Sequence, residues 1–321
     1  MEALKFYLSP EYGDGLASKT LAGRERIDFV RFAKLYMEKY VMDRMRRNVI
    51  RNAVEHFTGY QEKMGVRLYS HEMSKELLEC FADYLVKETT LANSTIGAIL
   101  RIVKFLLRKC NEYGYAYNPS YMDAKFREGE VFAIALEKRE IARLYYAENC
   151  GLTKRQKEIR DLFVLECQTG FRYSDLRRLK KEHIINNTIQ ITMKKTRRKA
   201  CVPLDKYVRE IFEKYGFALP KAPTIQSFNK MIKEICRKAG LTRVVAYETD
   251  KGGELVTVSE RLYKLVSTHT GRRSFVTNML RDGVQETAVM KCTGHQSMSS
   301  FARYNKISPE ENAIALSART I

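Results

Sequence analysis

The residues best suited to chemistry are concentrated toward the C-terminal end of the chain. His269 is followed three residues later by Arg272, and a Gly-His pair ending at His295 precedes Tyr304 by nine residues. A further arginine, Arg172, stands in Thr-Gly-Phe-Arg-Tyr-Ser-Asp-Leu, a hundred residues before Arg272. Guanidinium groups bind phosphate oxygens, imidazoles exchange protons near neutral pH and a phenol can act as a nucleophile. Together these residue types predict attack on a phosphodiester.

Tyr304 is the candidate nucleophile. A phenol, with a pKa of about 10, leaves phosphorus more readily than an alkoxide, so a phosphotyrosyl ester conserves bond energy and can be reversed. Either His269 or His295 could accept the tyrosine proton or donate a hydrogen bond to a phosphate oxygen. The chain has 19 tyrosines, and we expect most of them to be packing residues. Only its position after the Gly-His pair distinguishes Tyr304.

Arg172 and Arg272 are the candidate phosphate ligands, because guanidinium groups match phosphate oxygens and stay charged at any working pH. His269 lies three residues before Arg272, so on a helix that begins near Thr268 the two side chains share a face and can meet one phosphate. Arg273 would point elsewhere and contact a nucleic-acid backbone or its own fold.

A basic turn between two alternating segments supplies a proton donor. Residues 189–193 and 199–204 alternate as strands do, which predicts a β-hairpin with a cationic tip. A mobile hairpin could bring the ammonium group of Lys195 to the leaving 5′ oxygen as a general acid. Lys194 is adjacent and would point to the opposite face of a strand, so both lysines stay open as candidates.

The net charge predicts the class of partner. The 321 residues include 57 Lys plus Arg and 38 Asp plus Glu, a formal charge of +19. Such an excess favours a polyanion, with DNA or RNA first. No cluster of carboxylates is available to hold magnesium, and Cys292 and His295 form a C-x-x-H pair without a second pair of ligands nearby. We therefore expect no metal and no cofactor, which disfavours a metallonuclease.

The sequence predicts neither export nor a membrane span. The opening residues, 1–22, lack the basic-then-apolar order of a signal peptide, and no apolar run approaches membrane-spanning length. Seven cysteines are scattered singly, which is typical of thiols in a reducing compartment. We expect a cytoplasmic protein.

The first half of the chain predicts a small helical bundle. Apolar residues recur at steps of three and four over 29–41, 49–64, 77–85 and 96–110, and Asn93-Ser94 should cap the last helix. Positive charges without compensating carboxylates lie on the backs of two helices, which favours phosphate-backbone contacts over an ordinary solvated face. The candidate contacts are Arg46, Arg47, Arg51, Arg101, Lys104 and Arg108.

The helical periodicity fails around Pro119, where turn residues cluster and proline bars a continuing helix. This break predicts two domains joined by a linker. The expected division is a lead-in segment at 1–25, a helical domain at 26–114, a linker at 115–131 and a second domain at 132–321.

The second domain combines helices with the basic hairpin. A capping box from Thr153 to Gln156 begins a helix that Gly170 ends, and Arg172 then stands at the start of a short helix over 174–179. A loop or hairpin is expected around Gly252-Gly253. The fold class is therefore mainly α with a small β-sheet.

Three motifs, taken in order, resemble those of a known family. They are Thr-Gly-Phe-Arg172-Tyr-Ser-Asp-Leu, His269-Thr-Gly-Arg272-Arg-Ser-Phe, and Thr-Gly-His295-Gln-Ser followed by Tyr304. The chain resembles the tyrosine recombinases of the phage integrase family, and among them the Bacteroides-type integrases of mobile elements. No single motif is specific, but their order and spacing in one basic chain form a strong joint signal over residues 26–321.

The resemblance implies a helical, SAM-like core-binding domain and a mixed α/β catalytic domain that together clamp duplex DNA. It implies a site-specific recombinase or integrase that cleaves and rejoins strands through a 3′-phosphotyrosyl intermediate. His269 would accept the proton, His295 would donate to the phosphate, and Lys195 falls at the family's lysine position. The candidate catalytic set is Arg172, Lys195, His269, Arg272, His295 and Tyr304, with further DNA contacts at Lys194, Arg197, Arg198 and Arg273.

The resemblance also implies a homo-oligomer, with a tetramer on paired sites and a monomer or weak oligomer off DNA. A terminal helix beginning at Ser308-Pro309 is expected to pass to a neighbouring protomer. The chain departs from many family members at Gly271 and Arg273, where leucine and a second histidine are common. A glycine there costs up to about 1 kcal/mol relative to alanine, which would loosen the helix start.

Two other functions fit part of this pattern. A type IB topoisomerase-like enzyme uses the same kind of tyrosine and would relax DNA without pairing sites. A non-catalytic DNA-binding module would explain the charge and the helical bundle but not the spaced arginine, lysine, histidine and tyrosine set.

Overall fold

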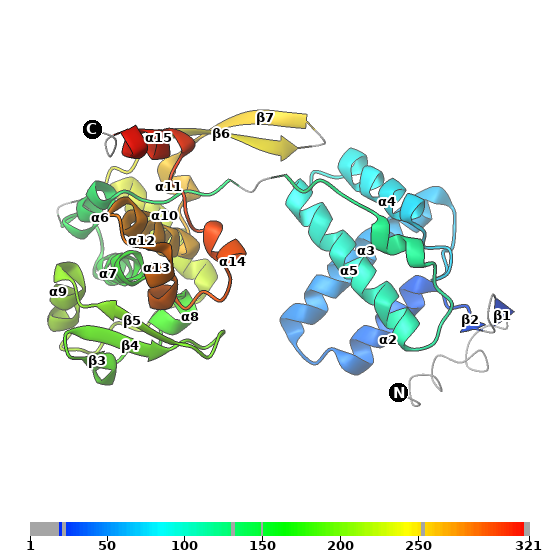
Figure 1. Cartoon of the computed structure of the whole chain (residues 1–321), viewed down its shortest axis with the longest axis horizontal. Coiled ribbons are helices and arrows are strands. Elements are labelled where there is room, and N and C mark those ends of the chain that lie inside the picture. The colour runs from blue at the N-terminus through cyan, green and yellow to red at the C-terminus, as the bar shows by residue number, and fades with distance from the viewer. Residues whose placement is uncertain (1–18, 21–23, 130–131, 149, 252–253, 318–321) are drawn as a thin grey trace. The chain divides into compact units, whose positions relative to one another are not determined.

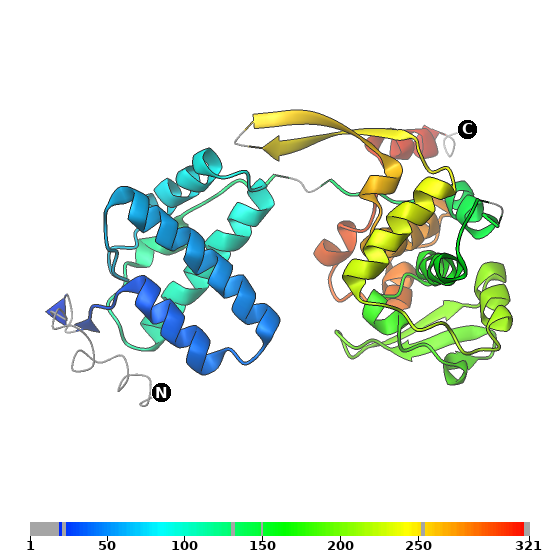
Figure 2. The ribbon, with the colours of Figure 1, turned by 180° about the vertical axis from the view of Figure 1, so that it is seen from behind.

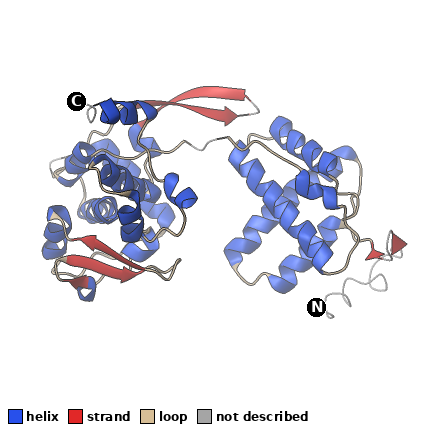
Figure 3. Cartoon of the chain, viewed as in Figure 1, coloured by secondary structure: helices blue, strands red, loops and turns tan. Residues whose placement is uncertain are grey.

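The computed structural model describes residues 19–20, 24–129, 132–148, 150–251 and 254–317. The chain is mainly helical with small antiparallel sheets, which confirms the expected fold class (Figure 3). It divides into two compact units, which we call the helical unit (1–131 with 248–258) and the mixed unit (132–247 with 259–321). Among the described residues, no helix combines the length and the apolarity that crossing a membrane requires.

Over its described residues, the helical unit contains four α-helices (Figures 1 and 2). They are α2 (Phe29–Tyr40), α3 (Arg44–Met64), α4 (Lys75–Glu88) and α5 (Asn93–Glu112). Asp28, Asp43 and Ser74 cap the first three, because each side chain accepts a hydrogen bond from a free amide of the first turn. The rings of Phe29 and Phe81 each meet Phe57 edge to face at 5.0 Å, so the apolar stripes predicted from the sequence form one core.

The cap predicted for α5 is wrong. The helix begins at Asn93 itself, Ala92 occupies the N-cap position, and no side chain caps the first turn. The carbonyl of Ala92 accepts hydrogen bonds from Thr95 and Ile96 at 2.8 and 3.1 Å, which places Asn93 one position too late to cap. The Oδ1 atom of Asn93 is buried and has no partner in the described structure.

Part of the segment expected to be a linker packs on the helical unit. Tyr115 and Tyr121 are buried in its core, and a short 3-10 helix, η3 (Pro119–Asp123), begins at the proline. The Nζ atom of Lys104 donates to the carbonyl of Met122 at 3.1 Å, which ties this segment to α5. The expected lead-in segment lies outside the described residues except for two short paired strands, β1 (Lys19–Thr20) and β2 (Arg24–Glu25).

The mixed unit is built around α7 (Lys154–Thr169), which is buried along most of its length. The Thr153–Gln156 capping box begins it and Gly170 ends it, as predicted. The surrounding helices are α6 (Lys138–Tyr145), α8 (Tyr173–Leu176), α9 (Lys206–Lys214), α10 (Ile225–Lys238), α11 (Leu262–Leu265), α12 (Thr268–Arg281), α13 (Glu286–Thr293), α14 (Met298–Ala302) and α15 (Pro309–Ser317).

The predicted basic hairpin is confirmed as β4 (Thr188–Thr192) and β5 (Lys199–Pro203), with Ile189 opposite Val202. A short third strand, β3 (Ile184–Ile185), follows a 3-10 turn, η4 (Lys181–His183), and pairs with the other edge of β4. A second hairpin pairs β6 (Val244–Lys251) with β7 (Glu254–Arg261). Its predicted turn at Gly252-Gly253 lies outside the described residues.

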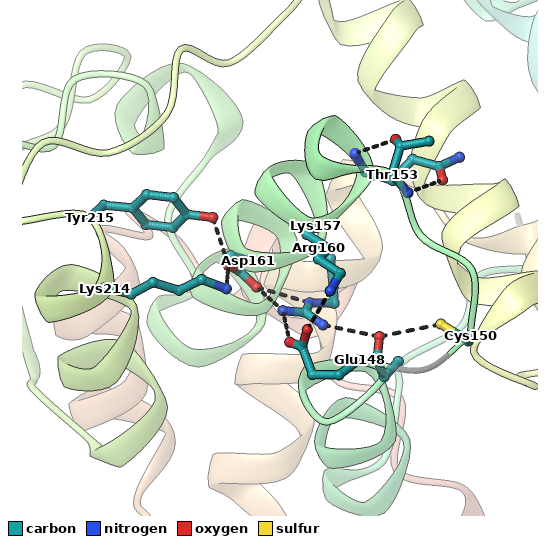
Figure 4. A network of polar contacts seen from close by, with 10 residues as sticks. Glu148, Cys150, Thr153, Lys157, Arg160, Asp161, Lys214 and Tyr215 are labelled. Atoms are coloured by element: carbon teal, nitrogen blue, oxygen red, sulfur yellow. Dashed lines mark hydrogen bonds and ion pairs between the residues drawn. The ribbon is translucent and has the colours of Figure 1, made fainter.

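An ion-pair network centred on the buried Arg160 and Asp161 anchors α7 (Figure 4). Asp161 is fully buried, and one carboxylate oxygen accepts hydrogen bonds from Lys214 and Tyr215, each at 2.8 Å. The other oxygen accepts from the Nε atom of the buried Arg160 at 2.9 Å, and Arg160 also contacts Glu148 at 2.8 Å. The hydrogen bonds from Lys157 and Arg160 lower the pKa of Glu148 to about 2. The network joins α7 to α9 and to the preceding loop, which makes α7 a rigid support for the residues that follow it.

Candidate active site

Arg172 stands on a sharp corner at the end of α7. Gly170 ends the helix in the left-handed conformation at φ 64°, and a Cβ atom there would lie 2.5 Å from the ring of Phe275. The turn places Arg172 at the N-terminal end of α8. The guanidinium is partly exposed, but its Nη1 atom is buried without a hydrogen-bond partner in the described structure. A buried cationic donor without a partner is costly, which suits a group that receives an anion.

Arg272 is 1% exposed and links three parts of the mixed unit. Its Nη1 atom donates to the carbonyl of Gly170 and its Nη2 atom to the carbonyl of Thr293, each at 2.7 Å. The Nε atom is buried and has no partner in the described structure. Burial and the positive charge of Arg172 lower the pKa of Arg272 to about 10, so it stays protonated at neutral pH.

His295 is buried beside Arg272, with its Nε2 atom 3.0 Å from the Nη2 atom of that arginine. Thr293 donates its hydroxyl proton to the carbonyl of Val289 at 2.7 Å, so its oxygen is free to accept from the Nδ1 atom of His295 at 2.7 Å. This network assigns the imidazole proton to Nδ1. Burial and the charges of Arg272 and Arg172 lower the pKa of His295 to about 3, so the ring is neutral. In this tautomer Nε2 accepts, and donation from Nε2 to a phosphate requires a proton shift.

Tyr304 follows α14 and lies against the same two residues. Its backbone carbonyl accepts a hydrogen bond from the hydroxyl of Thr277 at 3.1 Å, which fixes the segment on α12. The Cζ atom of Arg272 lies 5.2 Å from the centre of the Tyr304 ring, and the ring of His295 lies 4.8 Å away. The structure therefore brings together the tyrosine, Arg272 and His295, which the sequence analysis grouped.

His269 is exposed in the first turn of α12, with its ring centre 6.5 Å from that of Tyr304. The helix begins at Thr268, as predicted. Loss of solvent around the ring lowers its pKa, and the positive charges of Arg273, Arg272, Arg172 and Lys195 lower it further. A neutral imidazole at this position can accept a proton.

The hairpin tip distinguishes the two lysine candidates. The backbone amide of Lys194 donates to the buried carboxylate of Asp175 at 2.8 Å, and Asp175 lies three residues after Arg172. Both lysine side chains are exposed. Lys195 is among the charges that lower the pKa of His269, which favours Lys195 as the lysine that faces the site. Its role as general acid stays a prediction.

Gly271 corrects one expectation. A Cβ atom there would lie 2.9 Å from Cγ and 3.2 Å from Oε2 of Glu166, so the glycine lets α12 approach α7 closely instead of merely loosening a helix start. Glu166 is 1% exposed and its Oε2 atom has no partner in the described structure. Burial raises the pKa of Glu166, while the charge of Arg272 acts in the opposite direction. The sequence analysis missed Glu166, and the unusual glycine was the available signal.

We expect Gly271→Ala to destabilise the protein by about 1–3 kcal/mol, because the new methyl group overpacks against Glu166. Helix propensity alone would raise the free energy of unfolding by up to about 1 kcal/mol. The sign of the measured change in that free energy therefore shows which of the two effects is larger. Gly59 in α3 is the matched control, since a Cβ atom there would meet only the hydroxyl of Tyr84 at 3.5 Å. Denaturant unfolding of both variants measures the difference. A stabilised Gly271→Ala variant would refute the close-packing role.

The predicted DNA contacts of the helical unit lie on α3 and α5, and several have partners within the unit. Arg46 lies over the ring of Phe105 at 5.4 Å, and Arg47 donates to the carbonyl of Val41 at 2.7 Å. Arg51 contacts Asn48 at 3.3 Å, Arg101 pairs with Glu128, Lys104 donates to carbonyls, and Arg108 is exposed. Their contact with DNA stays a prediction.

The predicted DNA contacts of the mixed unit lie at the hairpin tip and on α12. Lys194, Arg197 and Arg198 are exposed at the hairpin tip, and Arg197 adopts the left-handed conformation at φ 57°. Arg273 is partly buried, and burial lowers its pKa. Over the residues that the structure describes, no group of three or more His, Cys, Asp or Glu side chains could hold a metal ion.

Family models match both units. A model of the phage integrase family matches residues 135–311, which is more than half of the chain, and a model of the phage integrase SAM-like domain matches residues 28–126. The chain belongs to the phage integrase family. The SAM-like match spans the four helices of the helical unit, and the larger match contains every candidate catalytic residue.

The integrase-family chain also resembles curated tyrosine recombinases. It is 28% identical over 149 residues to a tyrosine recombinase of Pseudothermotoga lettingae, covering 46% of this chain and 49% of that protein. It is 29% identical over 154 residues to the tyrosine recombinase XerD of Listeria innocua, covering 46% and 50%. The matches span about half the length of these curated relatives.

Solved integrase structures share the fold of this family member. The Tn1549 transposon integrase in complex with a circular intermediate DNA gives a TM-score of 0.67 at 14% identity, covering 91% of this chain and 99% of that one. A lambda integrase tetramer bound to a Holliday junction gives 0.59 at 13% identity, covering 84% and 76%. At these identities the likeness shows the fold.

Proposed function

We propose that this phage integrase family member is a site-specific DNA recombinase that cleaves and rejoins strands through a covalent 3′-phosphotyrosyl intermediate. The observation that carries the proposal is the packing of Tyr304 against Arg272, whose charge interacts with that of Arg172. Each of the two guanidinium groups holds a buried nitrogen atom without a partner in the described structure. Such an arrangement has donors in place for the oxygens of a phosphodiester and a nucleophile beside them.

The proposed cleavage step uses three groups, which are the phenol of Tyr304, the imidazole of His269 and the ammonium of Lys195. The Tyr304 oxygen forms a bond to phosphorus while the bond from phosphorus to the 5′ oxygen breaks. His269, held neutral by its surroundings, accepts the phenol proton, and Lys195 gives a proton to the departing 5′ oxygen. Rejoining is the same path in reverse, with the 5′ hydroxyl as nucleophile and Tyr304 as leaving group.

The two arginines stabilise the charge that develops on the non-bridging oxygens. The Nη1 atom of Arg172 and the Nε atom of Arg272 are the unpartnered donors. Removing one donor of this kind from an enzyme costs about 10²–10³ in rate. His295 holds Arg272 in place through its Nε2 atom and adds a donor to the phosphate once that nitrogen carries a proton.

Duplex DNA is the proposed partner, because the formal charge of +19 favours a polyanion and the candidate site suits a phosphodiester. We further propose that the chain serves a mobile element of the Bacteroides type, works in the cytoplasm and needs no metal or cofactor. Cleavage that disappears on chelation of divalent ions would contradict the last point.

We also propose a tetramer on paired sites in which α15 is exchanged between protomers. In this structure Glu311 of α15 forms two hydrogen bonds with the Nη2 atom of Arg281 in α12, at 2.8 and 3.0 Å. Ile314 and Leu316 are 69% and 65% exposed, so the helix leaves apolar surface uncovered on its own domain.

Deleting residues 308–321 should reduce assembly on paired sites at least tenfold while single-site binding stays near the level of the full chain. Gel-shift titration separates the single-site complex from the paired complex. Glu286→Gln on α13, an exposed acid outside α15, is the control and should assemble normally. Undiminished recombination by the deleted chain would remove the proposed exchange.

The test of the proposed function is a two-site assay. DNA sites are first selected from a random pool by binding, and one plasmid then carries two copies while a second carries a single copy. A recombinase resolves or inverts only the two-site plasmid. A type IB topoisomerase-like enzyme relaxes both plasmids equally, and a non-catalytic module changes neither, so either outcome would replace the proposal.

A further inference from the structure

A basic pocket lies beside the candidate active site, within the mixed unit. Its cavity of about 310 Å³ is lined by Arg198 and Lys199 from the hairpin, by Met290 and Lys291 from α13, and by His295 and Gln296 that follow α13. His295 thus belongs both to this pocket and to the group around Tyr304. We call these six residues the basic pocket.

The charges of the basic pocket are uncompensated. Arg198, Lys199 and Lys291 are all exposed, and no acidic residue lines the cavity. Across the described part of the chain, no carboxylate pairs with any of these three. Other lysines of the same unit do have acidic partners, as Lys264 has Glu260 at 3.0 Å. Three cations around one cavity repel each other, so an anion is the ligand that the pocket favours.

The two walls of the basic pocket are joined near their base. Gly294 ends α13 at φ 65°, and a Cβ atom there would lie 3.1 Å from Cγ of Met193 at the end of β4. The side chain of Gln296 donates to the carbonyl of Thr196 in the hairpin turn at 3.4 Å. These contacts fix the hairpin cations relative to Lys291 and to His295, so the pocket keeps a set position beside the candidate active site.

We propose that the basic pocket binds a backbone phosphodiester of the DNA strand next to the scissile phosphate. The proposal rests on the proposed function and names the ligand of a second subsite. His295 contacts Arg272 and also lines the basic pocket, and phosphates repeat regularly along a strand, so a strand whose scissile phosphate lies on Arg172 and Arg272 can place a neighbouring phosphate in the pocket. The lining contains no phenylalanine, tyrosine or tryptophan on which a base could stack, which favours the backbone over a base.

The subsite would fix the position of the protein along the DNA strand without recognising the base sequence. Backbone contacts fix the position of a protein on its duplex, whereas base edges carry the sequence information. Occupation of the basic pocket holds the strand so that the scissile phosphate, and not its neighbour, reaches Tyr304. Loss of the pocket should therefore weaken binding and also reduce the accuracy of the cleavage position.

The test combines Lys291→Ala with a scan of neutral methylphosphonates along a suicide DNA site. With the wild-type protein, a methylphosphonate at one position beside the scissile phosphate should weaken binding about tenfold. Lys291→Ala should weaken binding of unmodified DNA by a similar factor, lower the salt slope by about one and become insensitive to that one methylphosphonate. Lys199→Ala should lose sensitivity at the same position, and Lys264→Ala, which removes a paired lysine, should behave like the wild type.

Two outcomes would overturn the subsite. One is a Lys291→Ala protein that keeps the wild-type response at every methylphosphonate position. The other is competition by millimolar inorganic phosphate that depends on Lys291 while DNA binding does not, which would indicate a site for a free anion. Failure of the proposed function is a separate result, because the wild-type protein would then form no covalent adduct on the unmodified site.

Discussion

Replacing Tyr304 by phenylalanine should abolish covalent attachment to a suicide DNA site, in which the nicked product cannot be rejoined. The phenylalanine ring keeps the packing against Arg272 and His295, at 5.2 and 4.8 Å in the native site, but has no oxygen to attack phosphorus. Binding should survive with steep salt dependence, because the phosphate contacts come from other residues. We expect adduct formation to fall below about 10⁻⁴ of the wild-type level, since no other nucleophile takes the place of the phenol.

The measurement is a denaturing gel that separates free protein from protein linked to labelled DNA. Tyr207→Phe is the matched control, because Tyr207 is a partly buried tyrosine of α9 that packs against Tyr145 at 4.6 Å. It should give a normal adduct at the 3′ phosphate. An adduct formed equally by Tyr304→Phe would reject the assigned nucleophile and leave the family assignment intact.

Arg272→Lys should have the second-largest effect, with strand cleavage slowed about 10³-fold at saturating DNA. The native guanidinium reaches the carbonyl of Gly170 through its Nη1 atom, and the carbonyl of Thr293 and the ring of His295 through its Nη2 atom. An ammonium group has its donors on a single atom and cannot span the same partners while also facing a phosphate. Burial would also lower the pKa of the lysine and weaken its charge.

The loss of cleavage activity in Arg272→Lys should appear mainly in the single-turnover rate, because the interaction between Arg272 and the phosphate strengthens as charge develops on the phosphate oxygens. The free energy of unfolding should fall by about 1–3 kcal/mol for each carbonyl left without a donor. Arg143→Lys is the control, since Arg143 also donates to a carbonyl, that of Gly240 at 3.2 Å, at an exposed position. A wild-type cleavage rate in Arg272→Lys would show that Arg272 has only a structural role.

Local patterns in the sequence were enough to predict much of the scaffold. The capping box at Thr153, the helix start at Thr268 and the hairpin on either side of Lys195 were predicted because each depends on neighbours within a few residues. The cap predicted at Asn93 was wrong because it depends on the exact residue at which the helix begins. Capping requires one position to stay outside the helix, and the helix begins at Asn93 itself, one residue after the capping position.

The contact between Gly271 and Glu166 could not be predicted from the sequence. From the sequence, Gly271 looked like a weakness in a helix, because propensity concerns one helix at a time. In the folded chain the backbone at Gly271 lies against the buried side chain of Glu166, more than a hundred residues earlier. A contact between distant segments leaves no local pattern, so neither residue could be assigned a role beforehand.

The sequence by itself determined which residue types were available for phosphate chemistry, in which order they occur and on which kinds of element they stand. Composition and short spacing carry that information directly. Only the tertiary structure decided that Arg272 is buried between Gly170, Thr293 and His295, that Tyr304 lies over it, and that the hairpin and α13 enclose a basic pocket. These relations depend on how α7, α12, α13 and the hairpin pack, and packing joins residues that the chain keeps far apart.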